Sequence, residues 1–275
     1  MIELPEARVI AKDLKKEILG KKIVDVKGNF TDHKFTFYYH NPEEYKSFLT
    51  GKKITDIVER NFYIEIEAEE YKIIFRDGAN IRYYGKEENE PKKSKLLLKF
   101  EDGTFLNVTV AMYACIAVFD KNKGMDDNIY YNIELNGIGA LDQRFTYEYF
   151  HNLIDENTIK LSTKAFLATE QRILGIGNGV VQDILFHARL SPRTKMKDLS
   201  ELQIKNLYDS VMNTIHEMID KNGRDTEKDI YGNEGKYKTI MSNKSYKEGC
   251  PICRGEIKKE SYLGGSVYYC PVCQK

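Results

Sequence analysis

Four cysteines near the C-terminus constrain this 275-residue chain more than any other feature. They form two pairs, Cys250-Pro-Ile-Cys253 and Cys270-Pro-Val-Cys273, with sixteen residues between the pairs. Two Cys-x-x-Cys pairs at this separation are typical of a tetrahedral zinc site, because each tight turn brings two thiolates to one ion. We therefore predict a structural Zn²⁺ held by all four cysteines, on a β-hairpin formed by the residues between them. Two disulfide bonds are the alternative, which an intracellular chain disfavours.

The composition excludes several classes of protein. Hydrophobic residues make up 41% of the chain and charged residues 31%, which indicates a folded globular protein. No apolar run approaches the ~20 residues that span a bilayer. The N-terminus is acidic and does not resemble a signal peptide. We therefore expect a monomer in the cytoplasm, the bacterial cytoplasm or nucleoid, with no membrane partner.

The charges are unevenly spread, although the formal net charge is zero. Residues 160–200 hold seven Lys or Arg against three Asp or Glu, and residues 236–275 hold eight against three. Two basic stretches in a neutral chain favour one cationic face for a polyanion. The alternative is solvated charge without a partner.

Hydrophobic periodicity divides the chain into a β-rich part between two helical regions. Residues 4–19 have helical spacing, with Gly20 as the stop. Short β-type runs follow from residue 22 to about 141, and Asp102-Gly103 is a hairpin turn between two of them. These runs indicate a sandwich or flattened barrel. Helical stripes return after residue 144, including one over residues 163–174.

A glycine-rich turn separates two of the later helices. It reads Gly175-Ile176-Gly177-Asn178, and the next helix is expected to begin near Asn178. Glycines at a helix start expose backbone N–H groups that can hold a phosphate. Arg189 follows on the same module. We interpret this turn as a phosphate clamp, with a purely structural turn as the alternative.

Three motifs in this order resemble one family. They are the N-terminal MIELPE, the segment GIGNGVVQDILFHARLSP and the ending CPIC…YYCPVCQK. The chain is similar in these motifs to the formamidopyrimidine-DNA glycosylase and endonuclease VIII family, and the resemblance covers essentially its whole length. It implies an α+β fold, with an N-terminal helix and β-sandwich lobe, a helix-two-turn-helix lobe and a C-terminal zinc ribbon. The corresponding domains are residues 1–141, 142–235 and 236–275. The partner implied is damaged double-stranded DNA, with the damaged nucleotide flipped from the stack.

The resemblance also assigns catalytic roles at the N-terminus. In the family, an exposed proline amine attacks the sugar C1′ and a neighbouring glutamate transfers protons. Glu3 matches the glutamate, but Ile2 stands where the proline is expected. Because removal of an initiator methionine generally requires a small second residue, we expect Met1 to be retained and the nitrogen of Ile2 to be a non-nucleophilic amide. The terminal amine of Met1 is then the alternative nucleophile.

Other family positions also depart from the pattern. Phe62 stands in place of a catalytic lysine, and Gly265 in place of an arginine at the tip of the finger. The family's wedge motif corresponds to residues 110–115. Met112 or Tyr113 is a candidate replacement wedge, although a place in the β-core is the simpler interpretation.

The retained positions concern DNA binding. Asn178 matches a residue that contacts backbone phosphate in the family, and Lys164 matches a lysine near the lesion phosphate. A surface lysine on a helix is the alternative for Lys164. The DNA-binding residues expected from the sequence are Lys164, Gly177, Asn178 and Arg189.

Three functions are consistent with these observations. The first is a base excision repair glycosylase with altered chemistry, in which Glu3 assists hydrolysis of the N-glycosidic bond and conventional abasic-site lyase activity is not expected. The second is a non-catalytic binder of abasic or distorted duplex DNA. The third, a zinc-ribbon interaction module on an unrelated scaffold, is disfavoured by the GIGN segment.

Overall fold

The chain forms two compact units in a computed structural model that describes residues 1–31, 34–125 and 137–275. Among the described residues, unit 1 comprises residues 1–2, 6–125 and 227–234, and unit 2 comprises residues 3–5, 137–226 and 235–275. The three-part division at residues 141 and 235 stays a prediction. No helix of the described residues combines the length and apolar character that a membrane span requires.

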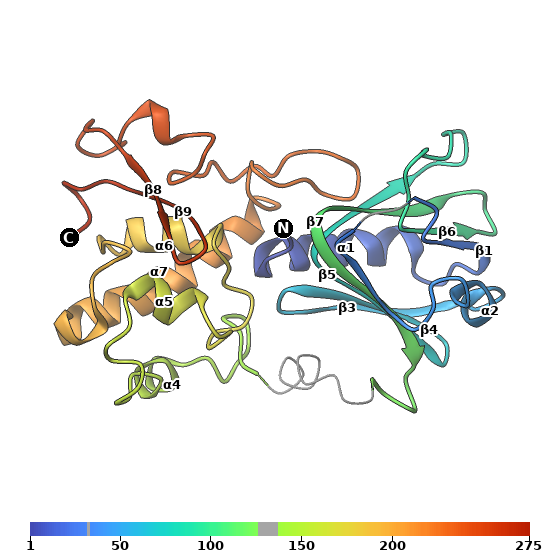
Figure 1. The fold of residues 1–275 in the computed structure, drawn as a ribbon, viewed down its shortest axis with the longest axis horizontal. Coiled ribbons are helices and arrows are strands. Elements are labelled where there is room, and N and C mark those ends of the chain that lie inside the picture. Colours follow the sequence, from blue (N-terminus) through green and yellow to red (C-terminus); the bar gives the residue numbers. More distant parts are fainter. Residues whose placement is uncertain (32–33, 126–136) are drawn as a thin grey trace. The chain divides into compact units, whose positions relative to one another are not determined.

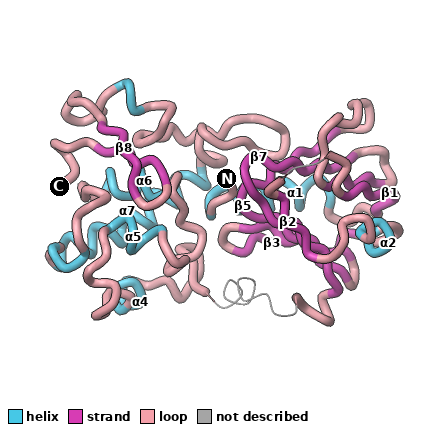
Figure 2. Tube along the Cα trace, in the orientation of Figure 1, coloured by secondary structure: helices cyan, strands magenta, loops and turns pink. Residues whose placement is uncertain are grey.

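Unit 1 contains most of the β-structure (Figures 1 and 2). Its elements are α1 (Leu4–Ile18, whose first residues belong to unit 2), β1 (Ile23–Gly28), β2 (Thr36–Tyr39), α2 (Tyr45–Leu49), β3 (Ile54–Arg60), β4 (Tyr63–Ala68), β5 (Tyr71–Tyr84), β6 (Leu96–Phe100) and β7 (Phe105–Asp120).

The strands form the predicted β-sandwich around a large apolar core. Their order is β1-β6-β7-β5-β4-β3, with β2 paired in parallel to β7. Both ends of this order contribute to the same buried cluster, Ile23 from β1 and Ile54 from β3, together with Leu14 from α1. Ile230 joins this core from the segment 227–234. The apolar face of α1 is therefore buried in unit 1, as its helical spacing predicts.

The predicted hairpin at Asp102-Gly103 connects β6 and β7. Gly103 has a positive φ of 84°, and its N–H donates to the carbonyl of Phe100. The Asp102 carboxylate accepts hydrogen bonds from the backbone and the hydroxyl of Thr104. The Asp-Gly pair thus has the turn chemistry expected from the sequence.

A bulge interrupts the pairing between the long strands β5 and β7. Asp77 pairs with Ala114 and Ala79 with Val110, so residues 111–113 lie opposite Gly78 alone. A Cβ on Gly78 would lie 2.6 Å from the carbonyl oxygen of Tyr113. The bulge therefore depends on the missing side chain at position 78.

Unit 2 is helical and ends in a two-stranded hairpin, β8–β9 (Figure 1). Its further elements are α4 (Tyr147–Asn152), α5 (Thr163–Ala168), α6 (Val180–His187), η1 (Met196–Asp198), α7 (Glu201–Asp220), η2 (Tyr246–Glu248), β8 (Lys258–Tyr262) and β9 (Gly265–Tyr269). Helices α4 to α7 share one apolar cluster, which also takes in Leu4. The helical lobe and the C-terminal hairpin are as predicted.

The helix expected over residues 163–174 is shorter than its apolar stripe suggests. Helix α5 ends at Ala168, and Glu170 and Gln171 have positive φ angles of 58° and 50°. The guanidinium of Arg172 donates to the carbonyls of Ala165, Phe166 and Thr169 at the C-terminal end of the helix. Arg172 thus caps α5 at Ala168, although the apolar pattern predicts a helix to residue 174.

We expect Gly78→Ala to destabilise unit 1, by about 1–3 kcal/mol, because the added methyl group meets backbone that the β-sheet holds in place. Urea unfolding of the purified protein measures this cost. Gly85→Ala is the matched control, since its nearest new contact is the flexible carboxylate of Glu88 at 3.5 Å. Equal unfolding midpoints for the two variants would contradict the close approach at Gly78.

Candidate functional site

The carboxylate of Glu3 lies at the N-terminus of α6 in unit 2. Its Oε1 accepts a hydrogen bond from the N–H of Gly179 at 2.9 Å. Its Oε2 accepts from Gly177 at 3.2 Å and from Val180 at 2.8 Å. Glu3 is buried. A residue distant in sequence thus supplies the negative charge that a helix N-terminus favours.

The glycine-rich turn therefore binds a carboxylate of its own chain. The N-cap position of α6 is Gly179, which has no side chain to cap the helix. Glu3 takes the N–H groups of Gly177, Gly179 and Val180. The expectation that this turn exposes those N–H groups to a phosphate is not met in this structure.

Arg224 is a member of this site that sequence reasoning missed. Its guanidinium is buried and lies 3.7 Å from Oε1 of Glu3. A Cβ on Gly179 would lie 1.7 Å from Nη1 of Arg224, so the guanidinium packs directly on the glycine. Arg224 lies in a polar segment without regular periodicity, and no local sequence signal distinguishes it from a surface arginine.

The two residues before Glu3 belong to unit 1. The N–H of Ile2 donates to the carbonyl of Asp77 at 2.8 Å, and its side chain is buried in the sandwich core. The terminal ammonium of Met1 forms an ion pair with Glu227 at 2.8 Å. Ile2 therefore has a structural role, and the Met1 amine must leave its ion pair and lose a proton before it can attack a carbon atom.

Two of the predicted DNA-binding residues hold the C-terminal hairpin. Lys164 is buried, and its Nζ donates to the carbonyl of Tyr262 in β8 at 2.6 Å. Burial lowers the pKa of Lys164 from its usual value. The side-chain amide of Asn178 donates to the carbonyl of Ser266 in β9 at 3.1 Å. The alternative of a surface lysine at position 164 is wrong, because both side chains anchor β8–β9 to the helices.

Arg189 is the predicted DNA-binding residue that faces solvent. It follows α6 with a positive φ of 61°, and its guanidinium lies 5.9 Å from the ring centroid of Phe186. Its charge is therefore exposed to solvent.

The four C-terminal cysteines converge on one point. Their sulfur atoms all lie within 4.8 Å of one another. The Sγ atoms of Cys250 and Cys273 are 3.8 Å apart, and those of Cys253 and Cys270 are 3.4 Å apart. A tetrahedral ion with Zn–S bonds of about 2.3 Å requires sulfur separations of about 3.8 Å. The sulfurs are too far apart for disulfide bonds, so the geometry fits a metal ion.

Exposed apolar side chains gather on unit 1 beside the bulge. They come from β7 and from β2 or the turn before it: Phe35 (51% exposed), Phe37 (59%), Met112 (68%) and Tyr113 (45%). Together with Ala111 they line a shallow, open groove of about 630 Å³. The interpretation of Met112 and Tyr113 as β-core residues is wrong, because the bulge turns them towards solvent. The alternation of Phe35 and Phe37 in the sequence predicts that their side chains share one face of a strand. It does not predict that this face is exposed to solvent.

Phe62 and Gly265, which depart from the family pattern, both lie in close packing contacts. Phe62 is buried, with the guanidinium of Arg76 5.4 Å from its ring centroid. A Cβ on Gly265 would lie 3.1 Å from Oδ1 of Asn178, so the hairpin approaches the glycine-rich turn closely.

Two protein-family models match the chain, one over its N-terminal part and one over the helical part that follows. The family model described as "Formamidopyrimidine-DNA glycosylase N-terminal domain" matches residues 1–110. The one described as "Formamidopyrimidine-DNA glycosylase H2TH domain" matches residues 137–229.

Individual relatives and solved structures resemble the chain over nearly its whole length. The chain is 25% identical to a formamidopyrimidine-DNA glycosylase of Lactococcus lactis subsp. cremoris over 284 residues, covering 100% of both chains. It is 26% identical to one of Bacillus anthracis over 287 residues, covering 100% of this chain and 99% of the relative. The crystal structure of the Lactococcus lactis protein with DNA containing an abasic site has a TM-score of 0.81, at 23% identity and 99% coverage of both chains. The same protein with DNA containing N7-benzyl-Fapy-dG has a TM-score of 0.82, also at 23% identity and 99% coverage of both chains. These structural matches show that the fold is shared.

We expect Gly179→Ala to destabilise unit 2 by about 1–3 kcal/mol, because its methyl group displaces Arg224 and crowds Glu3. Urea unfolding measures this cost. The same substitution in an Arg224→Ala background should be less costly, since removal of the guanidinium makes room. An equal cost in both backgrounds would show that Arg224 does not pack on Gly179.

Proposed function

The chain belongs to the formamidopyrimidine-DNA glycosylase and endonuclease VIII family, and on this premise we propose that it is a DNA glycosylase of base excision repair with altered chemistry. It binds damaged double-stranded DNA, and Glu3 assists direct hydrolysis of the N-glycosidic bond. Abasic-site lyase activity of the conventional kind is absent.

One observation carries the altered chemistry. The nitrogen of Ile2, where the family has a proline amine, is a backbone amide whose N–H donates to the carbonyl of Asp77. An amide nitrogen shares its lone pair with the carbonyl group and is not a nucleophile. The Ile2 amide cannot form a Schiff base at C1′, and the Met1 ammonium is held in an ion pair with Glu227, so water attacks instead.

In the hydrolytic step, Glu3 acts as the only general base. A carboxylate oxygen of Glu3 takes a proton from water as the water oxygen bonds to C1′. The bond between C1′ and the base nitrogen breaks, and its electron pair stays on that nitrogen. A positively charged, alkylated base leaves as a neutral molecule, so it needs no further acid. The products are the free base and an abasic site.

A second function, a non-catalytic binder of abasic or distorted DNA, is favoured by the contacts of Glu3. Its two oxygens already accept three backbone N–H groups and lie beside Arg224. A carboxylate held this way has fewer free lone pairs for a water molecule. The two functions differ in whether any base is released.

The contacts to DNA are proposed from exposure and charge. The exposed Met112 and Tyr113 insert into the duplex in place of the missing wedge motif, and Phe35 and Phe37 extend their apolar surface. Arg189 contacts a phosphate. Lys164 is buried, and its proposed contact rests on the family resemblance: we expect one of the two N–H groups that it does not donate to Tyr262 to reach a phosphate. Asn178 and Gly177 contribute to DNA binding indirectly, through the position of the glycine-rich turn in which they lie.

The cysteine cluster holds a structural Zn²⁺ through Cys250, Cys253, Cys270 and Cys273. We expect one zinc ion per chain by mass spectrometry of the native protein, and none in Cys253→Ser. Loss of the ion should also weaken binding to abasic DNA, because Lys164 and Asn178 are anchored to this hairpin. Cys115→Ser is the control, since Cys115 lies outside the cluster and should leave both readouts unchanged. Retention of the ion in Cys253→Ser would remove that cysteine from the ligand set.

Base release tests the role of Glu3. On duplex DNA containing N7-methylguanine, we expect Glu3→Gln to lower the rate of base release by at least about 100-fold, as for loss of a general base. Because Glu3 also caps α6, affinity for an abasic duplex is measured in parallel, and it should change far less than the rate. Glu17→Gln, a change in a half-buried carboxylate on α1 that accepts a hydrogen bond from the hydroxyl of Tyr231, is the control.

Two outcomes would replace this mechanism. Equal rates for the wild type and Glu3→Gln would remove Glu3 from the chemistry. Binding of abasic DNA without release of any base would favour the non-catalytic function. Borohydride added to the abasic complex traps a Schiff base, so a covalent adduct would instead establish attack by an amine, with Met1 the first to map.

A further inference from the structure

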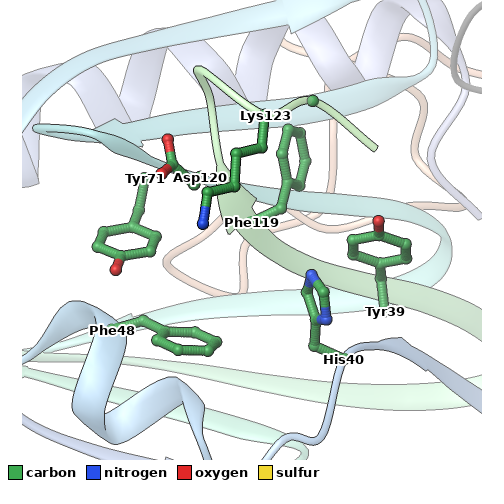
Figure 3. A pocket seen from close by; sticks show the side chains of 8 residues that line it. Tyr39, His40, Phe48, Tyr71, Phe119, Asp120 and Lys123 are labelled. Carbon is green, nitrogen blue, oxygen red and sulfur yellow. The ribbon is translucent and has the colours of Figure 1, made fainter. Parts of the chain in front are cut away.

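A second, separate cavity lies in unit 1, near the ends of β2 and β7 (Figure 3). Its volume is about 200 Å³. Sites for drug-sized ligands measure roughly 300–1,000 Å³, so this cavity suits a ligand of one or two fused rings. Neither the proposed hydrolysis nor the proposed DNA contacts use it.

Aromatic rings form most of the cavity wall. They come from four elements or the turns after them: Tyr39, His40, Phe48, Tyr71 and Phe119. Phe48 and Tyr71 are stacked, with ring centroids 5.4 Å apart and 12° between their planes. Tyr39 and Phe119 meet edge to face at 6.1 Å and 87°. The wall therefore offers both ring faces and ring edges to a planar ligand.

Two groups of opposite charge lie at the same cavity. Asp120 ends β7, and one of its carboxylate oxygens accepts the N–H of Asn122. Lys123 follows in the next turn, and its ammonium group points between the aromatic rings (Figure 3). Within the described part of the chain, no acidic side chain forms an ion pair with Lys123. A carboxylate only accepts hydrogen bonds and an ammonium only donates them, so together they select a ligand that does both.

We propose that this cavity binds a planar nitrogen heterocycle of the purine or pyrimidine type. Such a base has two flat faces for the rings, and its edge carries N–H donors for Asp120 beside oxygen or nitrogen acceptors for Lys123. A cation alone is disfavoured by the ammonium of Lys123, and a simple anion by the carboxylate of Asp120. An aliphatic ligand has no face to stack on the aromatic wall.

Saturation-transfer NMR with adenosine and cytidine tests this site. We expect saturation of the base protons by the wild-type protein, with dissociation constants of about 1 mM, as befits a small ligand. Lys123→Met and Asp120→Asn should each raise the dissociation constant about ten-fold, because each removes a charge-assisted hydrogen bond. Lys121→Met is the matched control, since Lys121 lies in the same turn and pairs with Glu67 instead.

Several outcomes would overturn the proposal: no saturation transfer at 10 mM nucleoside, equal affinity in Lys123→Met and the wild type, or a preference for tetramethylammonium over both nucleosides. Competition with a dodecamer of deoxyadenosine identifies the source of the base, because displacement of adenosine indicates a base within single-stranded DNA. Absence of displacement indicates a free nucleoside or base. Base release by Lys123→Met should equal that of the wild type, so the cavity and the proposed hydrolysis can fail independently.

Discussion

The hydrogen bonds between the Glu3 carboxylate and the N-terminus of α6 are the contact on which the rest of unit 2 depends. They satisfy three N–H groups of a turn that has no side-chain cap of its own. The N–H of Leu4 adds a bond to the carbonyl of Gly175, and Arg224 reaches the same carboxylate after α7. Three segments distant in sequence thus meet at one buried charge. A substitution at Glu3 therefore acts on stability and on chemistry together.

The residue before Glu3 has an equally definite role in unit 1. The side chain of Ile2 is buried in the sandwich core, which stabilises the fold by about 1.5–3 kcal/mol. Its N–H donates to Asp77, directly before Gly78 and the bulge that exposes Met112 and Tyr113. Ile2, which stands where the family has its nucleophilic proline, is thus part of the sandwich core. It lies next to the bulge that exposes Met112 and Tyr113.

Local features were predictable from the sequence. The Asp102-Gly103 turn, the apolar stripes of α1 and α7 and the cysteine spacing depend on neighbours a few residues apart. The failures involve distant or cross-strand partners. Helix α5 stops early because Arg172 caps it, and Tyr113 is exposed because Gly78 on the facing strand permits a bulge. Arg224 could not be assigned to the site, since nothing near it in the sequence marks its contact with Glu3.

The sequence by itself determined the family, the order of β-rich and helical parts, and the four candidate zinc ligands, because periodicity and spacing are properties of short segments. The tertiary structure alone decided which donors meet which acceptors. The N–H groups of the glycine-rich turn hold Glu3, and Lys164 and Asn178 hold the C-terminal hairpin. The physical reason is that a buried polar group must find a partner wherever the fold brings one within reach, and that partner is set by packing between segments far apart in the chain.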